Sequence, residues 1–239
     1  GYTVSISGGE SRTRDGSRSS ETFTVNNGQD YTFTVVATNR AGDSEPATIK
    51  ARTWAVPGSA TRGDVVQTNP TGAEFGGGEV RYSWNPPSNT GRAGKGIDFY
   101  WVRVGDGERQ RVDGTSVTVS GQSSEAASPA VSVRPCIVEG GGNVCAEADA
   151  ALRLDGIRVV TVPEAPVVEL TLTGGRNYSW SATAARDGGA PITKTEVCVR
   201  EGSGDCLSDA GPTGKGRYLG EVTVTATVTN AAGTSKTTT

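Results

Sequence analysis

Apolar and polar side chains alternate along much of this chain, which is the period of a β-strand. In Ile97–Val104, apolar or aromatic residues return at every second position, and Tyr31–Val36 shows a similar alternation. Valine and threonine are frequent in these runs, and β-branched side chains favour strands over helices. The Ala-rich stretch Ala146–Leu154 is the one place where we expect a short helical turn. The pattern therefore predicts an all-β fold.

The strand pattern repeats along the chain. Tyr82-Ser83-Trp84 recurs 96 residues later as Tyr178-Ser179-Trp180. Each copy is followed by a polar turn and then by an alternating apolar strand, Ile97–Val104 in the first case and Ile192–Val199 in the second. Repetition at a fixed spacing indicates repeated structural units.

The first residues add a third copy. Gly1–Ile6 matches the strand that contains Tyr100, at an offset of 98 residues, and Thr38–Ser44 returns as Thr229–Ser235, 191 residues later. These landmarks agree on a period of about 95 residues, which suits β-sandwich modules of roughly 100 residues.

Composition favours several small cores over one large core, because only 34% of the residues are hydrophobic and 6% aromatic. We predict three segments: residues 1–54, 55–162 and 163–239. The prolines at positions 57, 163 and 166 mark short, stiff linkers between them. Trp84 and Trp180 are predicted to be core residues.

Particular motifs resemble fibronectin type III modules. Trp84-Asn85-Pro86-Pro87 and the strand Ile97–Val102 are similar to the second and third strands of that family, and Val25–Asn39 is similar to its later turn and strand. The resemblance implies tandem fibronectin type III-like sandwiches joined by short Pro-containing linkers. It also implies that the hydroxyl of Tyr31 bonds the backbone a few residues upstream.

The resemblance is looser elsewhere. Val222 stands where the first segment has Tyr31, so residues 163–239 are similar to fibronectin type III or generic Ig-like modules. Residues 1–54 correspond only to strands C to G of a module. We expect that this segment was cut from a longer module; the alternative is that a neighbouring chain completes it.

The four cysteines form two close pairs, Cys136/Cys145 and Cys198/Cys206, each around a Gly-rich polar stretch. Opposed cysteines on a hairpin can form a disulfide, and the spacing favours these local pairs among the three connectivities that four cysteines allow. Zinc is the alternative, but it favours closer cysteine spacing and usually some histidine. Disulfides imply an extracellular or cell-envelope location.

Charge and hydropathy argue against two classes of partner. The net charge is −3, from 23 basic and 26 acidic residues spread along the chain, so no basic region suited to nucleic acid is expected. No apolar run reaches membrane-spanning length. Membrane insertion by these residues is therefore not expected.

Catalysis is also not expected. The chain has no histidine, which excludes the usual Ser-His-Asp and Cys-His arrangements. The nearby acids Asp106 and Glu108 are interpreted as solvated loop residues, and neither a metal nor a cofactor is predicted. Arg62-Gly63-Asp64 is an integrin-type tripeptide, but a three-residue match is weak in a Gly- and Arg-rich chain.

Strand parity provides a first candidate binding surface. If Tyr100 faces the core, then Phe99, Trp101 and Arg103 face outward. Arg134 is expected beside them, so that Trp101, Arg103 and Arg134 form a cation–π ladder next to Cys136. Exposed aromatic residues with arginine are typical of interface hot spots. The alternatives are that this ladder only stiffens the sheet or that a loop covers it.

The tip of the predicted Cys136–Cys145 hairpin is the second candidate. Ile137, Val138 and Val144 are its apolar residues and are expected to be exposed. A disulfide at the base lowers the ordering entropy of binding. Stabilisation of a small domain explains the disulfide equally well.

These inferences leave two functions open. The first is a non-catalytic adhesion segment of a bacterial cell-surface protein that binds another protein. The resemblance to bifidobacterial and related actinobacterial surface proteins implies a host extracellular protein as the partner, such as a cytokine. The second is a set of passive spacer modules in a secreted carbohydrate-active enzyme.

Overall fold

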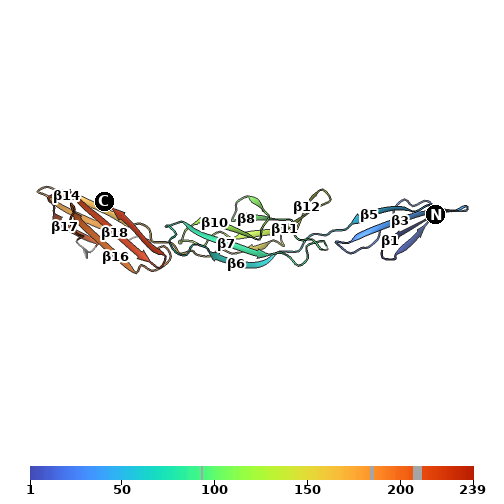
Figure 1. Ribbon diagram of the computed structural model, residues 1–239, viewed down its shortest axis with the longest axis horizontal. Coiled ribbons are helices and arrows are strands. Elements are labelled where there is room, and N and C mark those ends of the chain that lie inside the picture. The colour runs from blue at the N-terminus through green and yellow to red at the C-terminus, as the bar shows by residue number, and fades with distance from the viewer. Residues whose placement is uncertain (93, 184–185, 207–211) are drawn as a thin grey trace. The chain divides into compact units, whose positions relative to one another are not determined.

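The computed structural model describes residues 1–92, 94–183, 186–206 and 212–239. Over these residues the regular elements are strands, nineteen of them in five sheets, and each sheet contains antiparallel pairs (Figure 1). The prediction of an all-β fold is confirmed. Within the same ranges, no helix is long and apolar enough to cross a membrane.

The chain divides into two compact units. One comprises residues 1–62, 84–115 and 132–153, and the other comprises residues 63–83, 116–131 and 154–239. The predicted boundaries after residues 54 and 162 stay a prediction.

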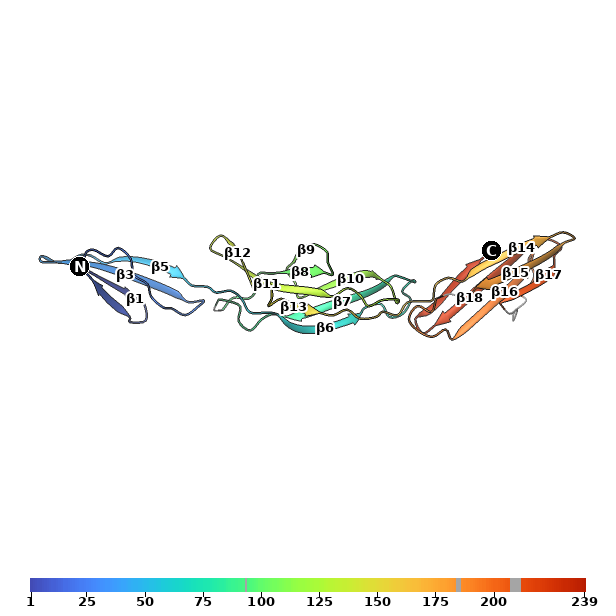
Figure 2. The same cartoon turned by 180° about the vertical axis from the view of Figure 1, so that it is seen from behind.

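The first unit contains two sheets, apart from a few strand ends. The N-terminal sheet has the order β2-β1-β3-β4, with β5 also paired to β3. Its strands are β1 (Tyr2–Ile6), β2 (Ser11–Arg14), β3 (Asp30–Asn39), β4 (Gly42–Asp43) and β5 (Ala47–Arg52). The other sheet has the order β12-β11-β8-β9, with β13 paired to β11 (Figure 2). Its strands are β8 (Phe99–Val104), β9 (Arg109–Val112), β11 (Val131–Glu139), β12 (Gly142–Cys145) and β13 (Leu152–Leu154).

The second unit contains three sheets, again apart from strand ends. One has the order β10-β7-β6, and its strands are β6 (Thr61–Gln67), β7 (Gly78–Asn85) and β10 (Ser116–Gln122). The next has the order β14-β15-β17, with β14 (Val167–Thr173), β15 (Asn177–Thr183) and β17 (Thr213–Arg217). The last has the order β16-β18-β19, with β16 (Lys194–Glu201), β18 (Val222–Asn230) and β19 (Gly233–Thr238).

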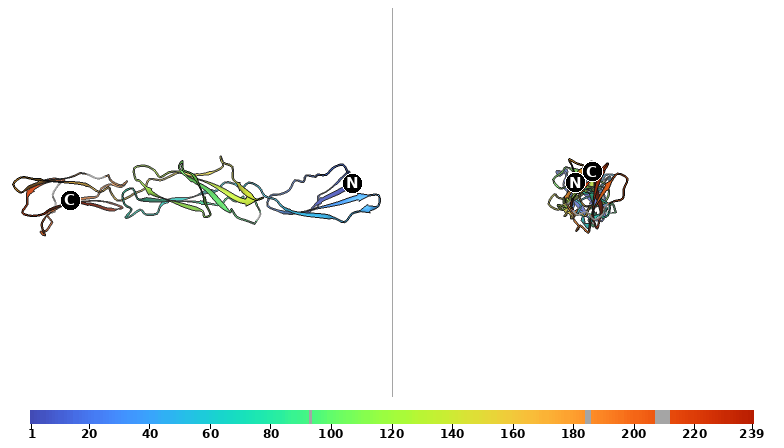
Figure 3. Two further views of the ribbon diagram at one scale, coloured as in Figure 1. Left: turned by 90° about the horizontal axis from the view of Figure 1, so that it is seen from above. Right: turned by 90° about the vertical axis from the view of Figure 1, so that its left-hand side faces the viewer.

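The last two sheets form a β-sandwich, which can be followed from above in Figure 3. Trp180 and Tyr178 project from β15, and Val197 and Val224 project from β16 and β18 into the same buried cluster. Alternation explains this packing, because every second residue of each strand points to the shared core.

The two repeated tryptophans are buried, as predicted. Trp180 is 5% exposed and belongs to the sandwich cluster, and Trp84 is 2% exposed. The Trp84 ring packs edge-on against Tyr100, with 5.4 Å between ring centroids. Each repeated tryptophan therefore has its own set of core neighbours.

Three local expectations can be compared with the structure. The Tyr31 hydroxyl accepts a hydrogen bond from the Asn26 N–H at 3.0 Å, which confirms its predicted contact with the upstream backbone. Within Ala146–Leu154, the Ala150 and Ala151 N–H groups donate to the Glu147 and Ala148 carbonyls at 3.2 and 3.4 Å, which gives a short turn before β13. Arg62-Gly63-Asp64 lies within β6, where Asp64 N–H donates to the Ser83 hydroxyl at 2.8 Å, and not at a loop tip.

Candidate functional site

The hairpin of β8 and β9 carries a group of arginines and one tryptophan on one face. Its register pairs Trp101 with Arg111 and Arg103 with Arg109. Opposed residues of an antiparallel pair lie on the same face of the sheet, as do residues two apart on one strand. We call Trp101, Arg103, Arg109 and Arg111 the arginine–tryptophan face. The alternate residues Tyr100 and Val102 are buried on the other side.

Trp101 is held in a fixed position by its aromatic neighbour. Its ring meets that of Phe99 edge-on, with centroids 5.4 Å apart and planes at 89°. The Arg111 guanidinium lies over the Phe99 ring, 4.3 Å from the centroid, and also bonds Asp113 at 3.0 Å. Trp101 itself is half-buried, so one part of the indole packs and another part faces solvent.

Two arginines of the arginine–tryptophan face oppose each other directly. Arg103 and Arg109 are both exposed, and within the described ranges neither makes an ion pair or side-chain hydrogen bond. Like charges directly opposite each other on a sheet are destabilising. The acids Asp106 and Glu108 lie in the turn between the strands, and both are exposed. The hairpin therefore presents two unpaired cations beside an aromatic surface.

The predicted cation–π ladder is corrected in two respects. Phe99 does point away from the side of Tyr100, but it is 0% exposed because Trp101 and Arg111 cover it. Arg134 is half-buried and donates from Nε and Nη2 to the Ala146 carbonyl at 3.0 and 2.6 Å, which occupies its guanidinium beside the hairpin. The observed cation–π contact on this face is made by Arg111, which the sequence reasoning missed.

A signal for the missing strand was present in the sequence. Gly105-Asp106-Gly107 ends the strand of Trp101, and Arg109 and Arg111 follow at alternate positions. A Gly-rich turn followed by alternation is the pattern of a hairpin. This pattern predicts a second strand that places Arg109 and Arg111 beside Trp101.

The second candidate is a tight hairpin. Cys136 pairs with Cys145 and Ile137 with Val144, and the turn is made by Gly140 and Gly141, whose φ angles are 61° and 81°. Two successive positive φ angles are typical of the turn that suits twisted hairpins, and glycine adopts them without steric cost.

Exposure at this hairpin differs from the expectation. Val138 is 46% exposed, as predicted, and Val144 is half-buried. Ile137 is 0% exposed, so it belongs to the core and not to a binding surface. The apolar surface offered by the tip is therefore small.

A buried arginine anchors this hairpin close to its turn. The Arg92 side chain is 5% exposed and pairs with Asp98 at 2.8 Å and with Glu139 at 2.9 Å. Asp98 also accepts the Val138 N–H at 2.7 Å. Burial favours the neutral acid, but the hydrogen bonds from Arg92 and Val138 hold the pKa of Asp98 below its ordinary value.

Both predicted disulfides are present, Cys136–Cys145 and Cys198–Cys206. Disulfides persist in oxidising compartments, so the two bonds suggest an environment outside the cytoplasm.

Compared with models of known protein families and with curated proteins, the chain matches none.

Proposed function

We propose that this chain is a non-catalytic protein-binding segment of a bacterial cell-surface protein, built from tandem fibronectin type III-like sandwiches. It binds an acidic region of another extracellular protein through the arginine–tryptophan face. A host protein is the partner that the resemblance implies.

The unpaired arginines carry the proposal. Arg103 and Arg109 repel each other across the β8–β9 pair, and an acidic partner relieves that repulsion when it binds. Arginine suits this role because its planar guanidinium binds a carboxylate through two parallel hydrogen bonds.

The tryptophan supports the same conclusion. Trp101 is held by Phe99 and loses little conformational freedom on binding, while part of its indole remains accessible. Tryptophan and arginine are the residues most enriched at energetic hot spots of protein interfaces.

The fibronectin type III-like architecture is supported by one specific contact. The Asn26–Tyr31 hydrogen bond has the form expected of the tyrosine corner in that family. The sandwich of β14–β19 and its repeated Tyr-Ser-Trp motif fit the same architecture.

The experiment is a binding survey with the full chain over an array of purified host extracellular proteins of graded isoelectric point. The expected result is saturable binding to acidic members that weakens at high salt, because exposed charges are screened. Trp101→Ala should reduce the affinity by about 30-fold, which corresponds to a hot spot of about 2 kcal/mol.

Two further variants make the survey decisive. Arg103→Glu removes an exposed cation that holds no other residue, so it should abolish binding while circular dichroism stays unchanged. Trp54→Ala is the matched control, because Trp54 is 42% exposed and lies outside the face. Absence of saturable binding, or equal binding by wild type and Arg103→Glu, would reject the proposal in favour of a passive spacer.

A further inference from the structure

The N-terminal sheet has an open apolar groove that no other strand covers in the described part of the first unit. Its volume is about 440 Å³, within the roughly 300–1,000 Å³ typical of binding pockets. Tyr2, Val4, Phe33 and Val35 line it from β1 and β3. Tyr2 is 38% exposed and Val35 36% exposed, values high for an inward-facing position of a sandwich.

An extended segment with the side-chain pattern of a strand borders this groove. From Glu21 to Val25, the partly buried residues Glu21, Phe23 and Val25 alternate with the exposed Thr22 and Thr24. Within the described ranges, no backbone group of Phe23, Thr24 or Val25 has a hydrogen-bond partner. An extended segment with free N–H and C=O groups is a template for another strand.

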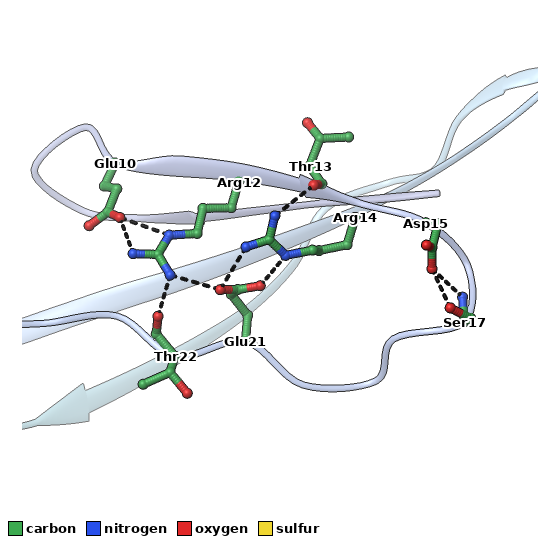
Figure 4. A network of polar contacts seen from close by, with 8 residues as sticks. All are labelled: Glu10, Arg12, Thr13, Arg14, Asp15, Ser17, Glu21 and Thr22. Carbon is green, nitrogen blue, oxygen red and sulfur yellow. Dashed lines mark hydrogen bonds and ion pairs between the residues drawn. The ribbon is translucent and has the colours of Figure 1, made fainter.

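Side-chain contacts hold the segment in place without a strand partner (Figure 4). The Glu21 carboxylate bonds Arg12 at 2.8 Å and Arg14 at 3.1 Å, both on β2. Arg12 also donates to the Thr22 carbonyl at 2.6 Å and lies over the Phe23 ring, 4.8 Å from its centroid. Phe23 packs against Phe33 with 5.9 Å between centroids. The free backbone edge of Phe23–Val25 is therefore already held in an extended conformation before another strand binds.

The C-terminal sandwich shows what covers the corresponding face. Its β18 matches β3, because Asn230 pairs with Gly233 as Asn39 pairs with Gly42, 191 residues apart. Phe33 then corresponds to Val224, which is fully buried in the cluster that contains Tyr178 and Trp180.

The same offset predicts the partner of the extended segment. Phe23 and Val25 correspond to Gly214 and Gly216 of β17, which pair with Trp180 and Tyr178 of β15. Side chains larger than glycine are compatible with such a pairing, because Tyr82 of β7 pairs with Val117 of β10.

We propose that this groove binds an extended strand of the Tyr-Ser-Trp type, by addition to the free edge of Phe23–Val25. The strand pairs antiparallel, its tryptophan opposite Phe23 and its tyrosine opposite Val25, and both rings enter the groove. Backbone hydrogen bonds then supply affinity, and the two rings supply specificity. This site is separate from the arginine–tryptophan face and does not depend on the function proposed for it.

The probe is a fluorescein-labelled peptide with the sequence of residues 78–87, titrated with the full chain and followed by fluorescence anisotropy. The expected result is saturable binding that is lost when the tyrosine and tryptophan of the peptide are both replaced by alanine. Hydrogen exchange at Phe23 and Val25 should slow on binding, since the amides of these two residues then bond the added strand.

Two variants of the full chain locate the site. Val35→Arg places a charge in the groove. Val25→Pro removes a backbone N–H that faces the added strand, because the residues opposite the tyrosine and tryptophan of β15 and β7 form the hydrogen-bonded pairs of the ladder. Each should weaken binding at least tenfold, whereas Leu219→Arg, at a residue 86% exposed elsewhere, should not. Because the Val25 N–H is unbonded within the described ranges, Val25→Pro keeps the test valid if Val35→Arg fails to fold. Peptide binding that is absent, insensitive to Val25→Pro, or protective only outside residues 21–35 would overturn the proposal.

Discussion

Replacing Arg109 by glutamate is expected to stabilise the β8–β9 hairpin while it removes the proposed binding activity. In the wild type, Arg109 lies directly opposite Arg103 and neither has a counter-ion within the described residues. The variant converts this repulsion into an attraction across the same strand pair.

The size of the stabilisation follows from the register of the β8–β9 pair. A like-charged pair directly opposite on a sheet is unfavourable by about 0.2–1 kcal/mol, and an opposite-charged pair is favourable by a similar amount. The change from one to the other should therefore raise the free energy of local opening by about 0.4–2 kcal/mol. Since 1.4 kcal/mol is tenfold in an equilibrium constant, opening should become about 2- to 30-fold rarer.

The assay is amide hydrogen exchange of the full chain, read by mass spectrometry on peptides that cover residues 99–112. Arg109→Glu should slow exchange there at low salt, and the difference should shrink at 1 M salt, where the Debye length is about 3 Å. Gln110→Glu is the matched control, because Gln110 opposes the uncharged Val102 on the other face. Unchanged or faster exchange in Arg109→Glu at low salt would refute the charge opposition on which the binding proposal rests.

Three further predictions concern stability. Replacing Cys136 and Cys145 together by serine should lower the free energy of unfolding by about 2.5 kcal/mol, from the loop entropy of a bridge with a sequence separation of 9, as measured by denaturant titration; no change would contradict it. Hydrogen bonds from Arg14 and Arg12 hold the pKa of Glu21 at about 2, below its ordinary 4.5. The stabilisation that ionised Glu21 provides should thus be complete above about pH 4.5 and lost as pH falls toward 2. An NMR titration midpoint of the Glu21 carboxyl near 4.5 would disprove this. Trp180→Ala should cost about 3–5 kcal/mol and unfold the β14–β19 sandwich, as followed by near-ultraviolet circular dichroism, and a retained spectrum would show that Trp180 does not organise that core.

Much of the fold was predictable because local patterns determine it. Alternation and β-branched residues predicted strands, and two of them, expected at Ile97–Val104 and Ile192–Val199, are observed as Phe99–Val104 and Lys194–Glu201. Close cysteine spacing predicted both disulfides. The repeated Trp84 and Trp180 identified core positions, because an indole at the same place in successive repeats is seldom a surface residue.

The candidate site was only partly predictable. Parity placed Phe99 and Trp101 on one face, but parity does not reveal what covers a residue, and Trp101 with Arg111 covers Phe99. Ile137 was expected at an exposed hairpin tip, yet it lies next to the disulfide at the hairpin base, where the sheet is still covered. Burial of this kind arises from tertiary packing, which the alternation of apolar and polar residues along a strand does not encode.

The interpretation of the groove beside Glu21–Val25 requires the sequence and the structure together. The sequence contains the repeat that relates Asn39 to Asn230, and the structure shows that one copy of the face is buried and the other open. Neither observation alone indicates a strand as the occupant.

The most direct test of the proposed function is the affinity of the double variant Arg103→Glu/Arg109→Glu for the acidic partner identified with wild type, measured by surface plasmon resonance at 150 mM salt. The account predicts that binding is abolished while the hairpin remains folded, because the face now repels an acidic surface. Binding at wild-type affinity would contradict it.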